Sequence, residues 1–121
     1  DSGFDIKTSN KGVSMTFKMA EEAVTKERLG KHDVTDMLAV SISSTDAIGH
    51  TYSTRGKENY EVYMQLDKDL AHFLRVLDRE VGRNNYLLFL TADHGAVHNG
   101  NYMNSHKMPG GGFPSTSTTN L

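Results

Sequence analysis

The longest amphipathic segment of this sequence, about residues 58–81, most restricts the folds that the chain can adopt. Its apolar residues recur three and four positions apart and form one stripe, while most of its charged residues fall on the other side. The stripe consists of Val62, Tyr63, Leu66, Leu70, Phe73, Leu74, Leu77 and Val81. Gly82 suits the position that follows a helix C-terminus. The pattern therefore predicts a helix over about 58–81 with one buried face.

Two short apolar runs, residues 37–42 and 86–90, flank this helix. Nearly continuous apolar runs of this length are typical of strands that are buried on both faces of a parallel sheet. A strand, a crossover helix and a second strand form a βαβ unit with a right-handed connection. The fold class predicted here is thus α/β: a three-layer α/β/α arrangement with a βαβ unit in a parallel sheet.

A further helix is predicted over residues 15–29, ahead of the first apolar run. Met15, Met19 and Ala23 recur at four-residue steps, and Gly30 ends the run. We interpret the methionines as core residues and expect this helix to pack on one face of the sheet.

The remaining segments are rich in Gly, Ser, Thr and Asn. They predict loops over residues 1–13 and 43–56 and a disordered or loop-like tail over about 109–121. The chain starts without Met and shows no change in composition that would divide it. We interpret residues 1–121 as a single partial domain, an internal piece of a larger catalytic domain.

The composition excludes several classes of function. A net charge of -2 indicates neither a nucleic-acid-binding surface nor an anionic membrane surface as partner. No apolar run approaches the roughly 18 residues of a membrane span. The chain has no Cys, which excludes a disulfide scaffold, a thiolate-ligated zinc site and a Cys nucleophile.

One carboxylate and one imidazole follow each predicted strand. Asp46 and His50 come after the first, and Asp93 and His94 come after the second, next to Gly95. Ligands of open α/β sheets bind beyond the carboxyl ends of the strands, and Asp oxygen and His nitrogen are zinc ligands. The pattern predicts a metal site made by these four residues. The spacing alone leaves open that the carboxylates cap turns and that the imidazoles are solvated.

The other histidines are weaker candidates for a functional role. His98 and His106 follow the second pair closely and are alternatives for a missing ligand. His32 lies in a polar turn and His72 on the charged face of the predicted helix, so we expect both at the surface.

Four segments together resemble a known family. They are S-S-T-D-A-I-G-H at residues 43–50, L-D-K-D-L-A at 66–71, F-L-T-A-D-H-G at 89–95 and H-K-M-P-G at 106–110. In order and spacing they resemble the alkaline phosphatase superfamily, in its type I phosphodiesterase/nucleotide pyrophosphatase branch. The most similar group is the phosphate-irrepressible alkaline phosphatases. The match runs from about residue 20 to 114.

The resemblance implies a zinc-dependent phosphoric ester hydrolase that acts on a phosphate ester substrate. Asp46 and His50 would ligate one zinc ion, and Asp93 and His94 would ligate a second. The Thr or Ser nucleophile, an Asp ligand near the start of the enzyme and a distal His ligand would lie outside this chain. The family also implies a periplasmic or secreted enzyme.

Two consequences follow for the isolated chain. With two protein ligands for each zinc ion and no nucleophile, it is expected to be inactive and to hold zinc weakly or only in part. An unpaired sheet edge also predicts self-association. The alternatives are a non-catalytic βαβ module and another branch of the superfamily, such as a sulfatase-like hydrolase or a metal-dependent mutase.

Overall fold

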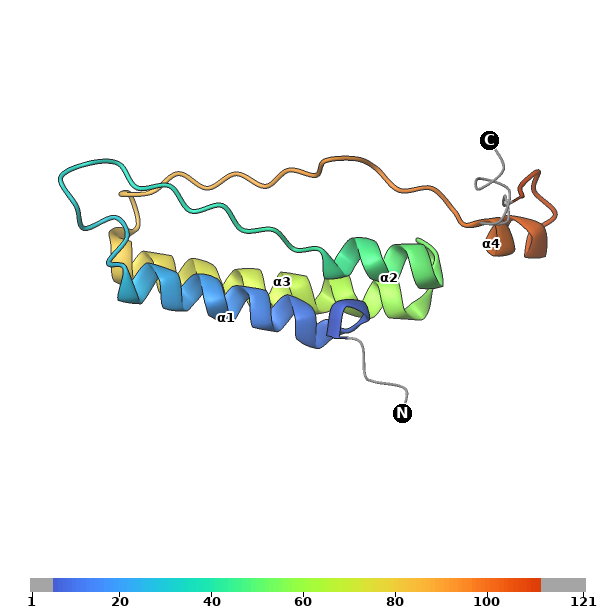
Figure 1. Ribbon diagram of the computed structural model, residues 1–121, viewed down its shortest axis with the longest axis horizontal. Helices are drawn as coiled ribbons and strands as arrows, with labels where there is room; N and C mark the ends of the chain where they lie inside the picture. The colour runs from blue at the N-terminus through green and yellow to red at the C-terminus, as the bar shows by residue number, and fades with distance from the viewer. Residues whose placement is uncertain (1–5, 112–121) are drawn as a thin grey trace, which may run out of the picture.

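The computed structural model of this chain describes residues 6–111, and Figure 1 shows their arrangement. Three long helices form a helical body, and two extended segments run over one side of it (Figure 1). The elements in chain order are the 3-10 turn η1 (Ile6–Thr8), α1 (Asn10–Lys26), α2 (Ser44–Tyr52), α3 (Lys57–Leu77), the π-helical turn η2 (Asp78–Gly82) and α4 (Gly100–Ser105). Among these helices, none is long and apolar enough to cross a membrane.

The core of the helical body lies where α1 and α3 pack against each other, with α2 beside them at one end of the body. Val13 and Val62 are fully buried, and Phe17 and Phe73 are each 4% exposed. The two phenyl rings meet at a tilted angle with their centroids 5.7 Å apart, a favoured geometry for an aromatic pair. Burial of such side chains is the main term that stabilises the body.

Helix α3 confirms the prediction of a long helix with a buried stripe. It spans Lys57–Leu77 and continues as η2 to Gly82, whose φ of 104° suits a residue without a Cβ. Phe73 and Leu77 are buried, as expected. Tyr63, which the pattern also placed on the stripe, is 53% exposed.

Helix α1 differs from its prediction in its start and in its buried face. It spans Asn10–Lys26, so the prediction of a loop over residues 1–13 was wrong for residues 10–13, and the predicted helical residues 27–29 lie beyond the end of α1. The buried stripe is Val13, Phe17, Ala20 and Val24. Met15 and Met19 are 51% and 64% exposed, so the assignment of these methionines to the core was wrong.

Helix α2 replaces a predicted loop. The prediction of a loop over 43–56 was wrong for Ser44–Tyr52, which is helical. Ile48 is 2% exposed and belongs to the same core as α1 and α3. At Gly12, an added Cβ would overlap Ser44 Oγ and the carbonyl oxygen of Ile6. Close approach of α1 and the packing of one apolar side chain thus stabilise a helix whose composition is that of a loop.

The predicted sheet is absent from residues 6–111, and this contradicts the α/β fold class and the three-layer α/β/α arrangement. Residues 37–42 and 86–90 are extended, but no backbone hydrogen bond joins them in the part of the chain that the structure describes. A strand needs a hydrogen-bonded neighbour, and apolar runs do not reveal whether one is present. Met37 and Leu87, which the prediction placed in strands buried on both faces, are 84% and 90% exposed.

The C-terminal tail is described only in its first residues. Residues 109–111 lie outside helices and strands, as the prediction of a loop expects. The rest of the predicted tail, 112–121, lies outside the described residues.

Candidate metal centre

The first predicted ligand pair lies on one face of α2. Asp46 is in the first turn of this helix and His50 in its last turn. Residues four apart are neighbours on a helix surface, and His50 Nε2 lies 3.3 Å from Asp46 Oδ1. Both side chains are more than half exposed, at 75% and 53%. The helix therefore holds a carboxylate and an imidazole side by side, facing outward.

The second pair follows the second extended segment and comes to the same place. His94 Nε2 lies 3.8 Å from Asp46 Oδ1 and 3.8 Å from Asp93 Oδ2. The backbone N–H of His94 donates to Asp93 Oδ1 over 3.1 Å, which makes a tight local turn. The structure thus brings together all four side chains that the sequence indicated, although they do not lie at the edge of a sheet.

The hydrogen bonds of His94 fix which ring nitrogen faces the carboxylates. Nδ1 donates to the carbonyl oxygen of Gly95 over 2.8 Å. This hydrogen bond, together with the negative charges of Asp93 and then Asp46, raises the pKa of His94, and partial burial opposes the shift. Nε2 is left facing the carboxylates. A histidine that ligates a metal commonly donates its other ring N–H to a backbone carbonyl in this way.

The cluster is an incomplete site by itself. Across residues 6–111, no three His, Asp or Glu side chains are arranged so that they could hold one ion. The contacts are pairwise, with Asp46 touching two imidazoles. The donor chemistry suits zinc, whereas the number of donors around any one point falls short of a complete site.

The remaining histidines make other contacts. His98 Nδ1 lies 2.6 Å from Thr54 Oγ1, and its ring packs on Tyr102, which in turn stacks on His106 with ring centroids 4.0 Å apart. The contact between Thr54 and His98 could not be predicted, because Thr54 is one of several hydroxyl residues in its segment and nothing in the sequence distinguishes it.

His32 and His72 are exposed, as predicted. The first hydrogen-bonds to Asp36, and the second lies 3.4 Å from Glu21. Hydrogen bonds from His32 and from the N–H of Gly30 lower the pKa of Asp36. These contacts are local features of the surface.

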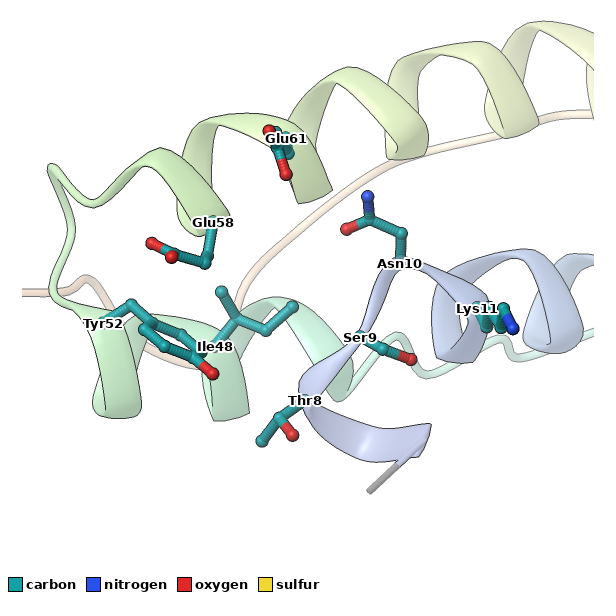
Figure 2. A pocket seen from close by; sticks show the side chains of 8 residues that line it. All are labelled: Thr8, Ser9, Asn10, Lys11, Ile48, Tyr52, Glu58 and Glu61. Carbon is teal, nitrogen blue, oxygen red and sulfur yellow. The ribbon is translucent and has the colours of Figure 1, made fainter. Parts of the chain in front are cut away.

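A cavity of about 280 Å³ lies on another side of α2. Figure 2 shows its lining side chains, which come from η1 and the start of α1, from α2 and from α3: Thr8, Ser9, Asn10, Lys11, Ile48, Tyr52, Glu58 and Glu61. Ile48 and Tyr52 follow Asp46 and His50 by two positions, about 200° around a helix. The cavity is therefore separate from the Asp/His cluster.

Comparison with known proteins identifies the family of this chain. The model of the family described as "Type I phosphodiesterase / nucleotide pyrophosphatase" matches residues 3–109. Alkaline phosphatase PafA of Elizabethkingia meningoseptica is 44% identical over 108 residues, which are 89% of this chain and 20% of that protein. Alkaline phosphatase PhoV of Synechococcus elongatus is 49% identical over 100 residues, which are 83% of this chain and 18% of that protein.

A solved structure extends the likeness to three dimensions. The crystal structure of wild-type alkaline phosphatase PafA superposes on this chain with a TM-score of 0.87 and 43% identity. The match covers 95% of this chain and 22% of the crystallised chain. The chain therefore spans about one fifth of the length of the relatives that it matches.

Proposed function

This chain belongs to the type I phosphodiesterase/nucleotide pyrophosphatase family, and we propose that the protein containing it is a metal-dependent phosphoric ester hydrolase of the alkaline phosphatase kind. The observation that carries the proposal is the 3.8 Å approach of His94 Nε2 to Asp46 Oδ1. It joins two segments that resemble the ligand motifs of the family. The chain spans about a fifth of its relatives, so the activity belongs to the larger protein.

In this proposal the four clustered residues hold two zinc ions. Asp46 and His50 bind one, and Asp93 and His94 bind the other. Their donor chemistry supports this, because carboxylate oxygen and imidazole nitrogen bind zinc when thiolate is absent. When bound, the zinc ions would supply positive charge that stabilises the oxygens of the phosphoryl group during its transfer.

The residues of this chain then act as ligands and not as the nucleophile. Ser44 is 7% exposed, and Thr45 Oγ1 donates to the carbonyl oxygen of Ile42 over 3.0 Å. The first of these two hydroxyls belongs to a buried residue, and the second is occupied by a backbone hydrogen bond. We therefore propose that the nucleophile and the missing ligands lie in other segments, and that this chain alone binds zinc weakly and turns over no ester.

The substrate and the location follow from the same family likeness. The proposed substrate is a phosphate ester, and the proposed chemistry is its hydrolysis. Periplasmic or secreted placement stays a prediction from the resemblance.

Zinc competition against a chromophoric chelator tests the ligand assignment on the 121-residue chain. His94→Ala and Asp46→Asn are expected to weaken zinc binding by at least about tenfold. His106→Ala is the matched control, because that exposed imidazole contacts Tyr102 and Ser105 instead. Equal zinc affinity in all four proteins would contradict the assignment and favour a non-catalytic module.

Activity of the longer protein tests the reaction. Asp93→Asn is expected to lower hydrolysis of an aryl phosphate by at least about a hundredfold and to lower the zinc content with it. His72→Ala, at an exposed position on α3, is expected to change neither. Faster hydrolysis of an aryl sulfate than of the phosphate would favour the sulfatase-like branch.

A further inference from the structure

A side-chain hydrogen bond joins the end of the second extended segment to the loop that follows α2. His98 Nδ1 lies 2.6 Å from Thr54 Oγ1, which is a short contact between a nitrogen and a hydroxyl oxygen. Every residue from 87 to 97 is exposed, whereas His98 and Thr54 are both half-buried. His98 is therefore the first residue after Tyr86 at which this segment becomes partly buried.

Thr54 takes part in this hydrogen bond from a well-fixed position. Its carbonyl oxygen accepts a hydrogen bond from the side-chain amide of Asn59 over 2.9 Å. Asn59 lies in α3 and is only 9% exposed, and Ser53, which precedes Thr54, is 4% exposed. Buried residues thus hold the loop between α2 and α3 on both sides of Thr54, which makes Thr54 a firm point of attachment.

The imidazole of His98 is also oriented by α4. Its ring packs against the ring of Tyr102, with the centroids 4.5 Å apart. Asn99, the next residue after His98, accepts a hydrogen bond from the N–H of Tyr102 over 2.9 Å and caps the start of α4. The cap and the ring contact together restrict the directions in which His98 can point.

The contact between His98 and Thr54 lies beside the candidate metal centre. Thr54 follows His50 by four positions, and His98 follows His94 by four. The segments therefore meet at two neighbouring points, one of which is the 3.8 Å approach of His94 to Asp46. Those two side chains are 58% and 53% exposed, and an exposed ion pair contributes little to attachment. The hydrogen bond between the two half-buried residues is the stronger of the two links.

The remaining hydrogen bonds of the second ligand pair do not reach α2. The N–H of His94 donates to Asp93, and His94 Nδ1 donates to the carbonyl oxygen of Gly95. Both stay within three consecutive residues, so they orient the two side chains without fixing where the segment lies. Among the hydrogen bonds of residues 87–98, the one between His98 and Thr54 is the bond that attaches the segment near α2.

We propose that His98 is a positioning residue for the metal centre. Its hydrogen bond to Thr54 holds the second ligand pair against α2, next to the first pair. His98 acts through the neighbouring segment and is not a ligand, since its Nδ1 is engaged with Thr54. The consequence for hydrolysis rests on the proposed function, whereas the placement of the segment is a property of the chain without metal.

Nuclear Overhauser spectroscopy of the 121-residue chain, with EDTA present, tests the placement without any metal. Cross-peaks between the imidazole protons of His94 and the side chain of Asp46 are expected in the wild type. Thr54→Val keeps the volume but removes the hydroxyl, and is expected to weaken these cross-peaks at least about threefold. Thr54→Ser keeps the hydroxyl and should preserve them. Thr51→Val is the matched control, because Thr51 Oγ1 donates to the carbonyl oxygen of Ala47 within α2.

Two results of this measurement overturn the proposal. One is the absence of the cross-peaks in the wild type, and the other is their full retention in Thr54→Val. The amide shifts of Phe17 and Phe73, in the core of the helical body, show in each case that the variant is folded.

Hydrolysis of an aryl phosphate by the longer protein tests the consequence for the reaction. His98→Ala and Thr54→Val are each expected to lower kcat/KM by about three- to tenfold, and the double variant is expected to lose little more than either alone. His98→Asn offers an amide to Thr54 but has no second ring nitrogen, and it is expected to restore most of the rate.

A loss in His98→Asn as large as in His98→Ala, together with no loss in Thr54→Val, would make His98 a metal ligand and overturn the proposal. Failure of the proposed function has a different signature, since hydrolysis would then be unchanged in Asp93→Asn. In that case the cross-peaks of the metal-free chain alone decide whether His98 places the segment.

Discussion

The α1–α3 body and the two extended segments are built from similar residues but bury them very differently. Phe73 is 4% exposed and Phe89 is 76% exposed; Leu77 is 8% exposed and Leu87 is 90% exposed. In the body each buried apolar side chain of the core cluster meets another from a facing helix. Along the extended segments, Ile42 and Tyr86 pack against this core, whereas Leu87 and Phe89 have no facing layer in the described chain. Burial thus depends on whether a partner is within reach, and not on the apolar character of a run.

The same contrast divides the candidate metal centre. Asp46 and His50 are held by α2, whose Ile48 packs into the helical core. Asp93 and His94 follow an exposed segment and are positioned by short-range hydrogen bonds, from His94 N to Asp93 and from His94 Nδ1 to Gly95. One half of the site is therefore built on the body and the other half on a segment outside it.

Truncating a phenyl ring in each region is the strongest test of this comparison. Phe73→Ala is expected to lower the free energy of unfolding by about 3–5 kcal/mol, because it removes buried contacts and leaves a cavity. Phe89→Ala is the matched control and is expected to change it by less than about 0.5 kcal/mol. Urea unfolding followed by circular dichroism at 222 nm measures both. A similar loss in the two variants would mean that the extended segment is as well packed as the body.

Close approach between α1 and α2 gives the next largest effect. Gly12→Ala would place a Cβ against Ser44 Oγ and the Ile6 carbonyl oxygen, and is expected to cost about 1–3 kcal/mol of stability. Gly49→Ala, also in a helix, meets only Asn59 Oδ1 at 3.8 Å and is expected to gain up to about 1 kcal/mol. Thermal unfolding of both variants checks the signs. A gain in Gly12→Ala would show that the contact between the helices relaxes easily.

The sequence predicted the parts of the fold that depend on local periodicity. The stripe of α3 contains Val62 and Phe73, and repetition along one helix is enough to identify it. Helix α2 was missed because residues 44–52 are mostly small or polar. The helix is stabilised by tertiary packing, since its Ile48 lies in the core with residues of α1. The prediction of a sheet was wrong because an apolar run such as 86–90 does not indicate whether a second strand is present to pair with it.

The proximity of the four candidate ligands was predicted better than the fold around them, whereas their role as ligands stays a prediction. Asp46 and His50 were paired by their spacing of four, which is a local property of one helix turn. The approach of His94 was inferred from a sheet that the described residues do not form, yet the chain still brings it to Asp46.

Exposed apolar side chains on the extended segments predict self-association of the isolated chain. Leu87→Lys is expected to raise the dissociation constant of the associated species by about tenfold or more, since a buried Leu contributes about 1.5–3 kcal/mol. Met19→Lys is the control, at a position 64% exposed on α1. Sedimentation equilibrium measures both. A wild-type chain that stays monomeric at high concentration would show that exposure alone does not drive association.

The smallest expected effect concerns the point where the second extended segment joins the helical body. Tyr86 Oη donates to Asp78 Oδ1 over 2.9 Å, and this hydrogen bond, with burial and the charge of Asp78, raises the pKa of Tyr86. Because the folded state favours the protonated phenol, its contribution to stability is present below the ordinary tyrosine pKa of about 10 and is lost as pH rises through the raised pKa.

Tyr86→Phe should therefore lower the urea midpoint at neutral pH by less than Gly12→Ala does, and the difference from wild type should shrink above pH ~10. Tyr63→Phe, on the exposed face of α3, should leave the midpoint unchanged at neutral pH. If the curves of wild type and Tyr86→Phe stay equally far apart up to pH ~11, the hydrogen bond to Asp78 is not what attaches the segment, and its attachment rests on packing alone.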